Sequence, residues 1–99
     1  MQIWLMAWPD FDEARRRTDL GIIPTGAVEA YGPHLPLGAD ALVAEAVARL
    51  VGEHTGGLVA PVIPVGESRA LAEFPGTLTV PAPAFRAYLG AIARSLIGW

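Results

Sequence analysis

Two apolar runs and one long helical pattern dominate the first two thirds of the chain. Residues 20–24 (LGIIP) and 58–65 (LVAPVIPV) lack the polar alternation of a half-exposed strand, which is typical of strands covered on both faces. Between them, residues 41–54 carry apolar side chains around most of a helical circumference, so we expect this helix to pack on more than one side. The order strand, helix, strand predicts a right-handed βαβ unit with a parallel sheet, and hence an α/β fold.

Shorter patterns flank this unit. A helix is predicted to begin at Trp8, because Pro9 suits a first turn and acidic residues follow near the positive end of the dipole. A last helix is predicted from about Pro83 to Ile97, with apolar residues on one face at helical spacing. The remaining elements are a short strand or extended lead-in, one helical turn, a tight turn and a short strand, at residues 3–7, 69–73, 74–77 and 78–80.

The loop at residues 26–40 (GAVEAYGPHLPLGAD) concentrates polar chemistry between the first predicted strand and the helix. It carries two carboxylates, one imidazole and one phenol, from Glu29, Asp40, His34 and Tyr31. Polar side chains on a stiff loop between buried elements more often serve chemistry than packing. Parallel strands bring their carboxyl ends to the same edge, so this loop and residues 66–68 are expected to face one crevice.

Several interpretations of these residues remain open. Glu29, His34 and Asp40 offer ligands that suit zinc or manganese. Alternatively, Asp40 caps the following helix and His34 is a turn residue. Tyr31 either donates a hydrogen bond or binds a metal weakly, or else it packs its ring and exposes its hydroxyl to water, as phenols commonly do.

Further ligands would have to come from elsewhere, and Glu67 and Ser68 are the polar candidates at the predicted edge. A serine nucleophile is not supported, because neither Ser68 nor Ser95 has a His and an acid in a recognisable arrangement.

The composition indicates a single domain whose surface is unusually rich in apolar residues. The 99 residues are 53% hydrophobic and 17% charged, whereas charged residues make up about a quarter of an ordinary soluble domain. This excess indicates surface reserved for a subunit interface or for the remainder of a larger domain.

Charge and cysteine content exclude other classes. The net charge is -3, and the only basic cluster, residues 15–17, is interpreted as a solvated helix face, which argues against nucleic-acid binding. The absence of cysteine excludes disulfides and thiolate sites and fits a cytoplasmic protein. The apolar residues 1–8 are too short for a signal peptide, and no run approaches the roughly 20 residues that cross a bilayer.

Three segments resemble the amino-terminal part of the creatininase family, the creatinine amidohydrolases and their relatives. They read IIPTGAVEAYGPHLPLGAD, APVIPVGES and FPGTLTV, and the opening WPDFDEARRRTDLGIIP is similar to that family's start. The likeness runs along nearly all 99 residues, and the motifs GPHLPLGxD and FPGT in this order make it specific.

The resemblance implies a three-layer α/β/α domain with a mostly parallel sheet, of which residues 1–99 form the amino-terminal portion. It implies hydrolysis of a small-molecule amide, often cyclic, by metal-activated water at a centre of zinc or manganese, and a homo-oligomer. It makes Glu29 and Asp40 metal ligands, with Asp40 bridging, and places His34 close to the metals. Ser68 then touches substrate, and Glu67 and Tyr31 are further candidates for substrate contact.

Two positions depart from the family pattern. Tyr31 stands where typical members have a histidine ligand, because EAYG replaces EQHG, and Leu71 stands where members often have histidine. The His and Glu ligands of the family's second half have no counterpart in these 99 residues. The leading hypothesis is a metal-dependent amidohydrolase site, of which this chain holds part. The rivals are a non-catalytic α/β module that oligomerises and a domain that binds small molecules without metal.

Overall fold

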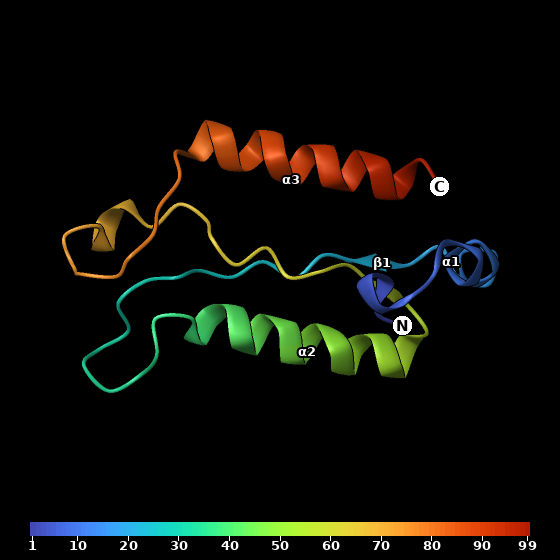
Figure 1. Cartoon of the computed structure of the whole chain (residues 1–99), viewed down its shortest axis with the longest axis horizontal. Helices are drawn as coiled ribbons and strands as arrows, with labels where there is room; N and C mark the ends of the chain where they lie inside the picture. Colours follow the sequence, from blue (N-terminus) through green and yellow to red (C-terminus); the bar gives the residue numbers. More distant parts are fainter.

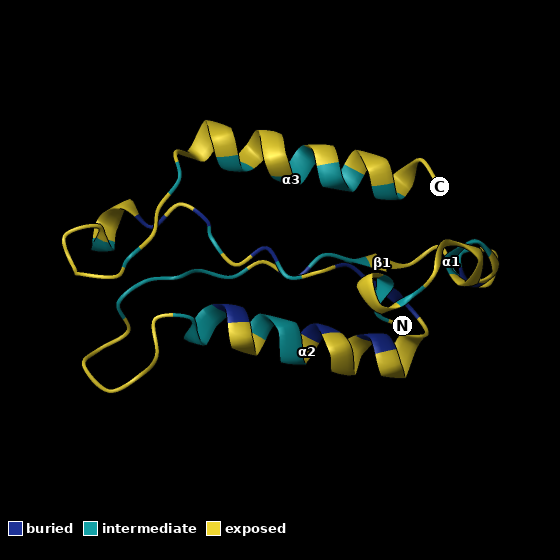
Figure 2. Cartoon of the chain, viewed as in Figure 1, coloured by how far each residue is buried: buried dark blue, intermediate teal, exposed yellow.

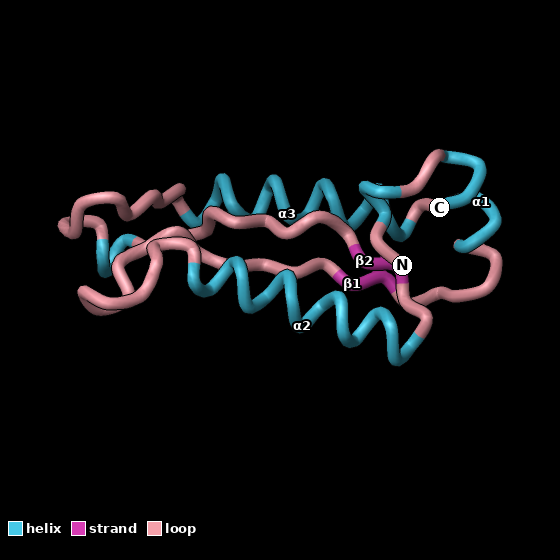
Figure 3. The backbone as a smooth tube through the Cα atoms, turned by 60° about the horizontal axis from the view of Figure 1, so that its bottom comes forward, coloured by secondary structure: helices cyan, strands magenta, loops and turns pink.

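The computed structural model describes all of residues 1–99 and places one helix on each face of a narrow parallel sheet (Figures 1 and 3). Helix α2 lies below the strands in Figure 1, and α3 lies above them. No helix combines the length and the hydropathy needed to cross a bilayer. The elements are η1 (Ile3–Leu5), α1 (Trp8–Ala14), β1 (Gly21–Ile22), α2 (Ala39–Thr55), β2 (Leu58–Val59), η2 (Arg69–Leu71) and α3 (Ala82–Ile97).

The predicted βαβ unit is confirmed, with shorter strands than the apolar runs indicate. Strands β1 and β2 pair in parallel with Gly21 opposite Leu58, and α2 forms the crossover. One further parallel bridge joins Thr25 to Ile63. Regular pairing is interrupted because the prolines in both runs have no N–H to donate to a ladder.

Two local predictions are wrong. Residues 3–7 form no strand: Ile3–Leu5 is a 3-10 helix, and only Gln2 pairs with β2, opposite Val59. Asp40 is not the N-cap of α2, because the helix begins at Ala39 with Gly38 as its N-cap and no side chain caps it. Asp40 lies instead in the first turn, where its charge still interacts favourably with the helix dipole.

The core lies between α2 and β2. The buried apolar residues are Ala14, Ala41, Ala48, Leu58, Val59, Ala60 and Ile63. Figure 2 shows the buried positions of α2 on the side that faces the strands, whereas α3 has no buried residue at all. The predicted burial of α2 on more than one side is therefore not found within this chain, since Val43, Val47 and Leu50 are exposed.

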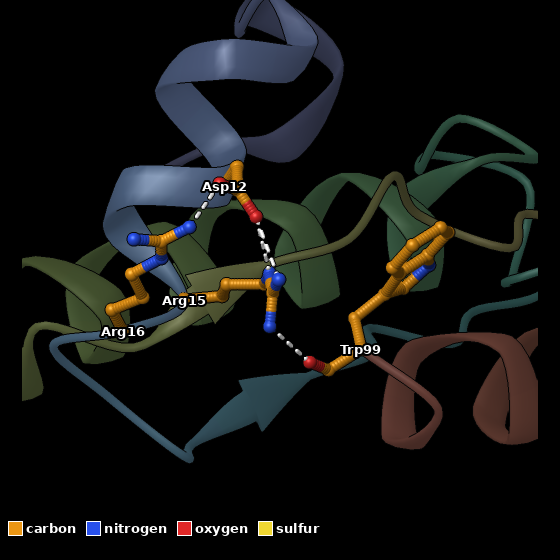
Figure 4. A network of polar contacts seen from close by, with 4 residues as sticks. All are labelled: Asp12, Arg15, Arg16 and Trp99. Atoms are coloured by element: carbon orange, nitrogen blue, oxygen red, sulfur yellow. Dashed lines mark hydrogen bonds and ion pairs between the residues drawn. The ribbon is translucent and has the colours of Figure 1, made fainter.

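A polar network connects α1 to the end of α3 (Figure 4). Asp12 accepts hydrogen bonds from Arg15 Nε at 2.8 Å and from Arg16 Nη2 at 2.7 Å. Arg15 Nη1 also donates to the backbone carbonyl of Trp99 at 2.6 Å. The hydrogen bond from Arg15, and then the nearby guanidinium charges, hold the pKa of Asp12 below its usual value. The basic cluster is therefore not entirely a solvated face, because Arg15 links two helices.

The exit from β1 passes unusually close to α2 at Gly26. A Cβ on this residue would lie 2.3 Å from Ala41 Cα and 2.6 Å from Ala41 N. Atoms cannot approach so closely, so only glycine allows the chain to cross the first turn of α2 here. Gly38 differs, because nothing lies within 4 Å of the corresponding Cβ position.

We expect Gly26→Ala to lower the free energy of unfolding by about 2–3 kcal/mol, since the added methyl group must displace backbone. The matched control Gly38→Ala should cost about 1 kcal/mol or less, because the added methyl group meets open space and only the N-cap preference for glycine over alanine is lost. Urea denaturation followed by circular dichroism measures both. Equal effects of the two substitutions would contradict the close approach.

We expect Asp12→Asn to destabilise the protein at pH 7 and to have no such effect in acid. A lowered folded-state pKa stabilises the fold fully above the unfolded pKa of about 4, and this contribution is lost as the pH falls through the folded pKa. Denaturation midpoints of parent and variant between pH 7 and pH 2 test this. Asp19→Asn is the control, because Asp19 forms no ion pair, and a constant difference across this range would disprove the linkage.

Candidate functional site

The two loops that follow β1 and β2 meet at one edge, as the parallel topology predicts. Gly26 N–H donates to the Ile63 carbonyl at 2.9 Å, which continues the pairing past the strands. Gly66 lies against the same point, since a Cβ on it would be 3.4 Å from the Gly26 carbonyl oxygen. The 26–40 loop and the 66–68 loop therefore begin side by side.

Residues 77–80 form hydrogen bonds with the 26–40 loop. Thr77 Oγ1 accepts a hydrogen bond from Ala30 N–H at 3.1 Å. The next residue, Leu78, donates its N–H to the Val28 carbonyl at 2.8 Å and forms an antiparallel bridge there. The backbone on both sides of Glu29 is thus held by a segment almost fifty positions further along the chain.

The same segment fastens the second loop. Thr79 Oγ1 accepts a hydrogen bond from Ser68 N–H at 2.8 Å. Val80 N–H donates to the Gly66 carbonyl at 3.0 Å. Residues 77–80 thus connect the two loops through alternating side-chain and backbone contacts. The sequence indicated a short strand here but not the roles of the two threonine hydroxyls, although the alternation TLTV was the available signal.

The 26–40 loop separates its four polar candidates into two pairs. Glu29 and Asp40 lie half-buried near its two ends, and Glu29 N–H donates to the Leu37 carbonyl at 2.9 Å, which closes the loop. Tyr31 and His34 lie on the exposed turn between them. Nowhere in the chain do three or more His, Asp or Glu side chains group as a metal site, so Glu29, His34 and Asp40 do not converge.

The 66–68 loop presents one exposed carboxylate and one buried hydroxyl. Glu67 is exposed, and its Oε1 accepts a hydrogen bond from Arg69 N–H at 3.0 Å and lies 3.9 Å from Arg69 Nε in an ion pair. Ser68 is 4% exposed, and its Oγ has no hydrogen-bond partner. A buried hydroxyl without a partner costs free energy, so Ser68 Oγ indicates a polar group that this chain does not supply.

The donor set fits part of a divalent metal centre. Carboxylates suit zinc and manganese, and half-burial of Glu29 and Asp40 limits competition from water. Two carboxylates fall short of the four or more ligands that such an ion takes. Tyr31 and Leu71 stand where the family pattern has histidine, and in the structure Tyr31 is exposed and Leu71 is half-buried. No cluster of His, Asp or Glu side chains elsewhere in the chain replaces these two histidines.

A cavity of about 700 Å³ lies elsewhere, between α1, α3 and residues 60–61. None of its lining residues belongs to the 26–40 loop or the 66–68 loop. Apolar and aromatic side chains dominate it, among them Trp8, Phe11, Tyr88 and Trp99. The polar edge and the apolar cavity are therefore separate features.

Comparison with known proteins gives a single family. A family model described as creatinine amidohydrolase matches residues 4–99. The mycofactocin precursor peptide peptidase of Mycobacterium ulcerans (strain Agy99) is 38% identical over 87 residues, which cover 79% of this chain and 35% of that protein. The peptidase of the same name from Mycolicibacterium smegmatis is 37% identical over 84 residues, covering 79% of this chain and 34% of that protein.

Solved structures agree with this result. A creatinine amidohydrolase (creatininase) and a structure described as creatininase Mn each superpose with a TM-score of 0.88 at 27% identity. Each superposition covers 96% of this chain and 39% of the other. A further mutant creatininase is described as the Zn-Zn type. The chain thus spans about a third of the length of its curated relatives.

The hydrogen bond to Thr77 Oγ1 should stabilise the backbone of the 26–40 loop. Thr77→Val removes the acceptor of the Ala30 N–H and should cost about 1 kcal/mol of stability, whereas Thr77→Ser keeps the acceptor and most of the stability. Urea denaturation gives the energies, and NMR hydrogen exchange gives the protection of the Ala30 amide. If the amide exchanges equally fast in both variants, the proposed contact is wrong.

Proposed function

The chain belongs to the creatininase family, and we propose that it carries the amino-terminal part of a metal-dependent site that hydrolyses an amide C–N bond. The proposal is based on the groups at one edge of the βαβ unit. Glu29 and Asp40 supply two half-buried carboxylates there, and Ser68 on the neighbouring loop supplies a buried hydroxyl without a hydrogen-bond partner. Acidic ligands beside an unsatisfied donor suit a site that binds a cation and a polar substrate.

In this proposal the carboxylates of Glu29 and Asp40 would hold a divalent ion, zinc or manganese. His34 lies on the exposed turn and does not group with the two carboxylates, so in this proposal it is not a direct metal ligand. A divalent ion here supplies polarisation of the scissile carbonyl and a bound water of lowered pKa. Support comes from two solved relatives, one described as creatininase Mn and the other as a mutant creatininase of the Zn-Zn type.

The chain's other residues orient the substrate. Ser68 Oγ donates to or accepts from a polar substrate atom, which would satisfy the buried hydroxyl. Glu67 and Tyr31 are exposed and form the rim of the site. The substrate class is a small amide, either cyclic or a peptide bond. The names of the relatives support both, since creatininase and a precursor peptide peptidase share cleavage of an amide bond.

Two carboxylates leave the metal short of ligands, so the proposal requires donors from outside residues 1–99. A non-catalytic module that associates through its apolar surface is the second candidate, favoured by the exposed hydrophobic residues of α2 and α3. Such a module would have the same fold and would hydrolyse no substrate.

Metal titration by calorimetry tests the ligand assignment. We expect the chain to bind Zn²⁺ or Mn²⁺ weakly, and Glu29→Gln and Asp40→Asn each to lower the affinity at least about tenfold, since each removes a charged ligand. Glu53→Gln, at an exposed position of α2, is the matched control and should change nothing. Unchanged binding in both loop variants would eliminate the metal role.

Turnover separates the two candidate functions. The assay offers creatinine, small lactams and short peptides, with Zn²⁺ or Mn²⁺ added. Hydrolysis that stops with a chelator would support the enzyme and exclude the module. Because the donor set is partial, we expect little turnover from the 99 residues alone, and the metal titration remains the decisive measurement.

A further inference from the structure

The FPGT motif, residues 74–77, forms a tight turn beside the candidate site. Thr77 N–H donates to the Phe74 carbonyl at 3.2 Å, and Gly76 has a φ of +89°. Proline in second position and a positive φ in third position are the features of a type II β-turn. Figure 1 shows this turn and the 26–40 loop at the same end of the molecule. The turn therefore directs Thr77 toward this loop.

The turn also packs against the point where the 26–40 loop closes. A Cβ on Gly76 would collide with Leu37 Cδ1. The carbonyl of Leu37 accepts the hydrogen bond from Glu29 N–H at 2.9 Å. Glycine at this position therefore serves both the positive φ of the turn and the close approach of the loop. The motif thus contacts the loop that carries the first proposed metal ligand.

Three hydrogen bonds hold the backbone around Glu29. One is the bond that closes the loop, and another runs from Leu78 N–H to the Val28 carbonyl at 2.8 Å. Both join backbone groups and therefore persist in a Thr77 variant. The third, from Ala30 N–H to Thr77 Oγ1 at 3.1 Å, depends on a side chain. Substitution of Thr77 therefore removes one defined restraint beside Glu29 and leaves the other two.

Thr79 forms the corresponding contact with the other loop. Its Oγ1 accepts the hydrogen bond from Ser68 N–H at 2.8 Å. Thr77 and Thr79 are two positions apart in an extended segment, so their side chains lie on the same side of it. The two hydroxyls thus make matched contacts, one beside the carboxylate of Glu29 and one at the residue with the buried hydroxyl.

We propose that Thr77 and Thr79 are positioning residues that act on different halves of the proposed site. Thr77 fixes the backbone beside Glu29 and so orients a metal ligand. Thr79 fixes the backbone of Ser68 and so orients a hydroxyl that contacts substrate. A ligand that is already held in its binding geometry loses less conformational entropy when the ion binds, which raises the affinity. The inference rests on the proposed function, because it takes Glu29 as a ligand of the ion.

Metal affinity separates this role from a purely structural one. Thr77→Val removes the acceptor of the Ala30 N–H at nearly constant volume, and we expect it to weaken Mn²⁺ binding about fivefold, the equivalent of one hydrogen bond. Thr77→Ser keeps the acceptor and should bind Mn²⁺ as the parent does. Thr25→Val is the neutral control, because Thr25 is exposed and lies outside both loops.

Thr79→Val provides the second arm of the experiment. It removes a hydrogen bond of the same kind from the other loop, so we expect it to change the Mn²⁺ affinity less than about twofold. Without metal, hydrogen exchange should accelerate at the Ser68 amide in this variant and at the Ala30 amide in Thr77→Val, at least about fivefold in each case. Equal losses of Mn²⁺ affinity in both valine variants would indicate a general loss of structure and overturn the proposal.

Paramagnetic broadening of the NMR signals by Mn²⁺ gives the affinities, and circular dichroism checks that each variant is folded. A second measurement needs no variant. Because coupling between binding and local order is reciprocal, saturating Zn²⁺ should slow exchange of the Ala30 amide about fivefold in the parent. Unchanged exchange of this amide would contradict the proposal even where Thr77→Val fails to fold.

Glu29→Gln distinguishes failure of this inference from failure of the proposed function. If Glu29→Gln lowers the Mn²⁺ affinity and Thr77→Val does not, Thr77 is not a positioning residue and the metal role stands. If neither variant changes the affinity, the ion does not bind at Glu29, and both the proposed function and the inference are wrong. Weaker binding in both variants, with parent affinity in Thr77→Ser, supports the inference.

Discussion

The contact between Gly26 and the first turn of α2 controls how the strand leads into the loops. Without a side chain, Gly26 passes against Ala41 and still pairs with Ile63, so one residue fixes the end of β1, the start of α2 and the continuation of β2. The loops on either side start from this point, which is why they share an edge. A packed backbone crossing of this kind tolerates almost no change in volume.

Residues 77–80 then fix the backbone of the two loops that share this edge. Their contacts span 47 positions between Thr77 and Ala30 and 11 positions between Thr79 and Ser68. Neither loop has a regular element of its own to set its backbone. The carboxylate of Glu29 and the hydroxyl of Ser68 are therefore positioned by hydrogen bonds to a single extended segment, which is preceded by a turn with Gly76 at a φ of +89°.

Hydrophobic periodicity and turn residues predicted the helices, because helix formation depends mainly on neighbouring residues in the sequence. Helical periodicity placed α3 to within one residue at its start. It predicted a helix over residues 41–54, and α2 extends one residue further and ends at Gly56, with a φ of +73°. The parallel topology followed from the order of elements and predicted that the two loops meet. Asp40 was misplaced because the short-range preference for a capping acid competes with the geometry of Gly38. The threonine contacts were missed because long-range hydrogen bonds leave no periodic trace.

The exposed state of α3 has a thermodynamic consequence. A helix with no buried residue contributes little to the cooperative unit formed by β1, α2 and β2, so it opens at low free energy. Apolar surface on α2 and α3 that a partner covers would leave water at the moment of association. Covering that surface would give association a negative heat-capacity change, because apolar area is removed from water.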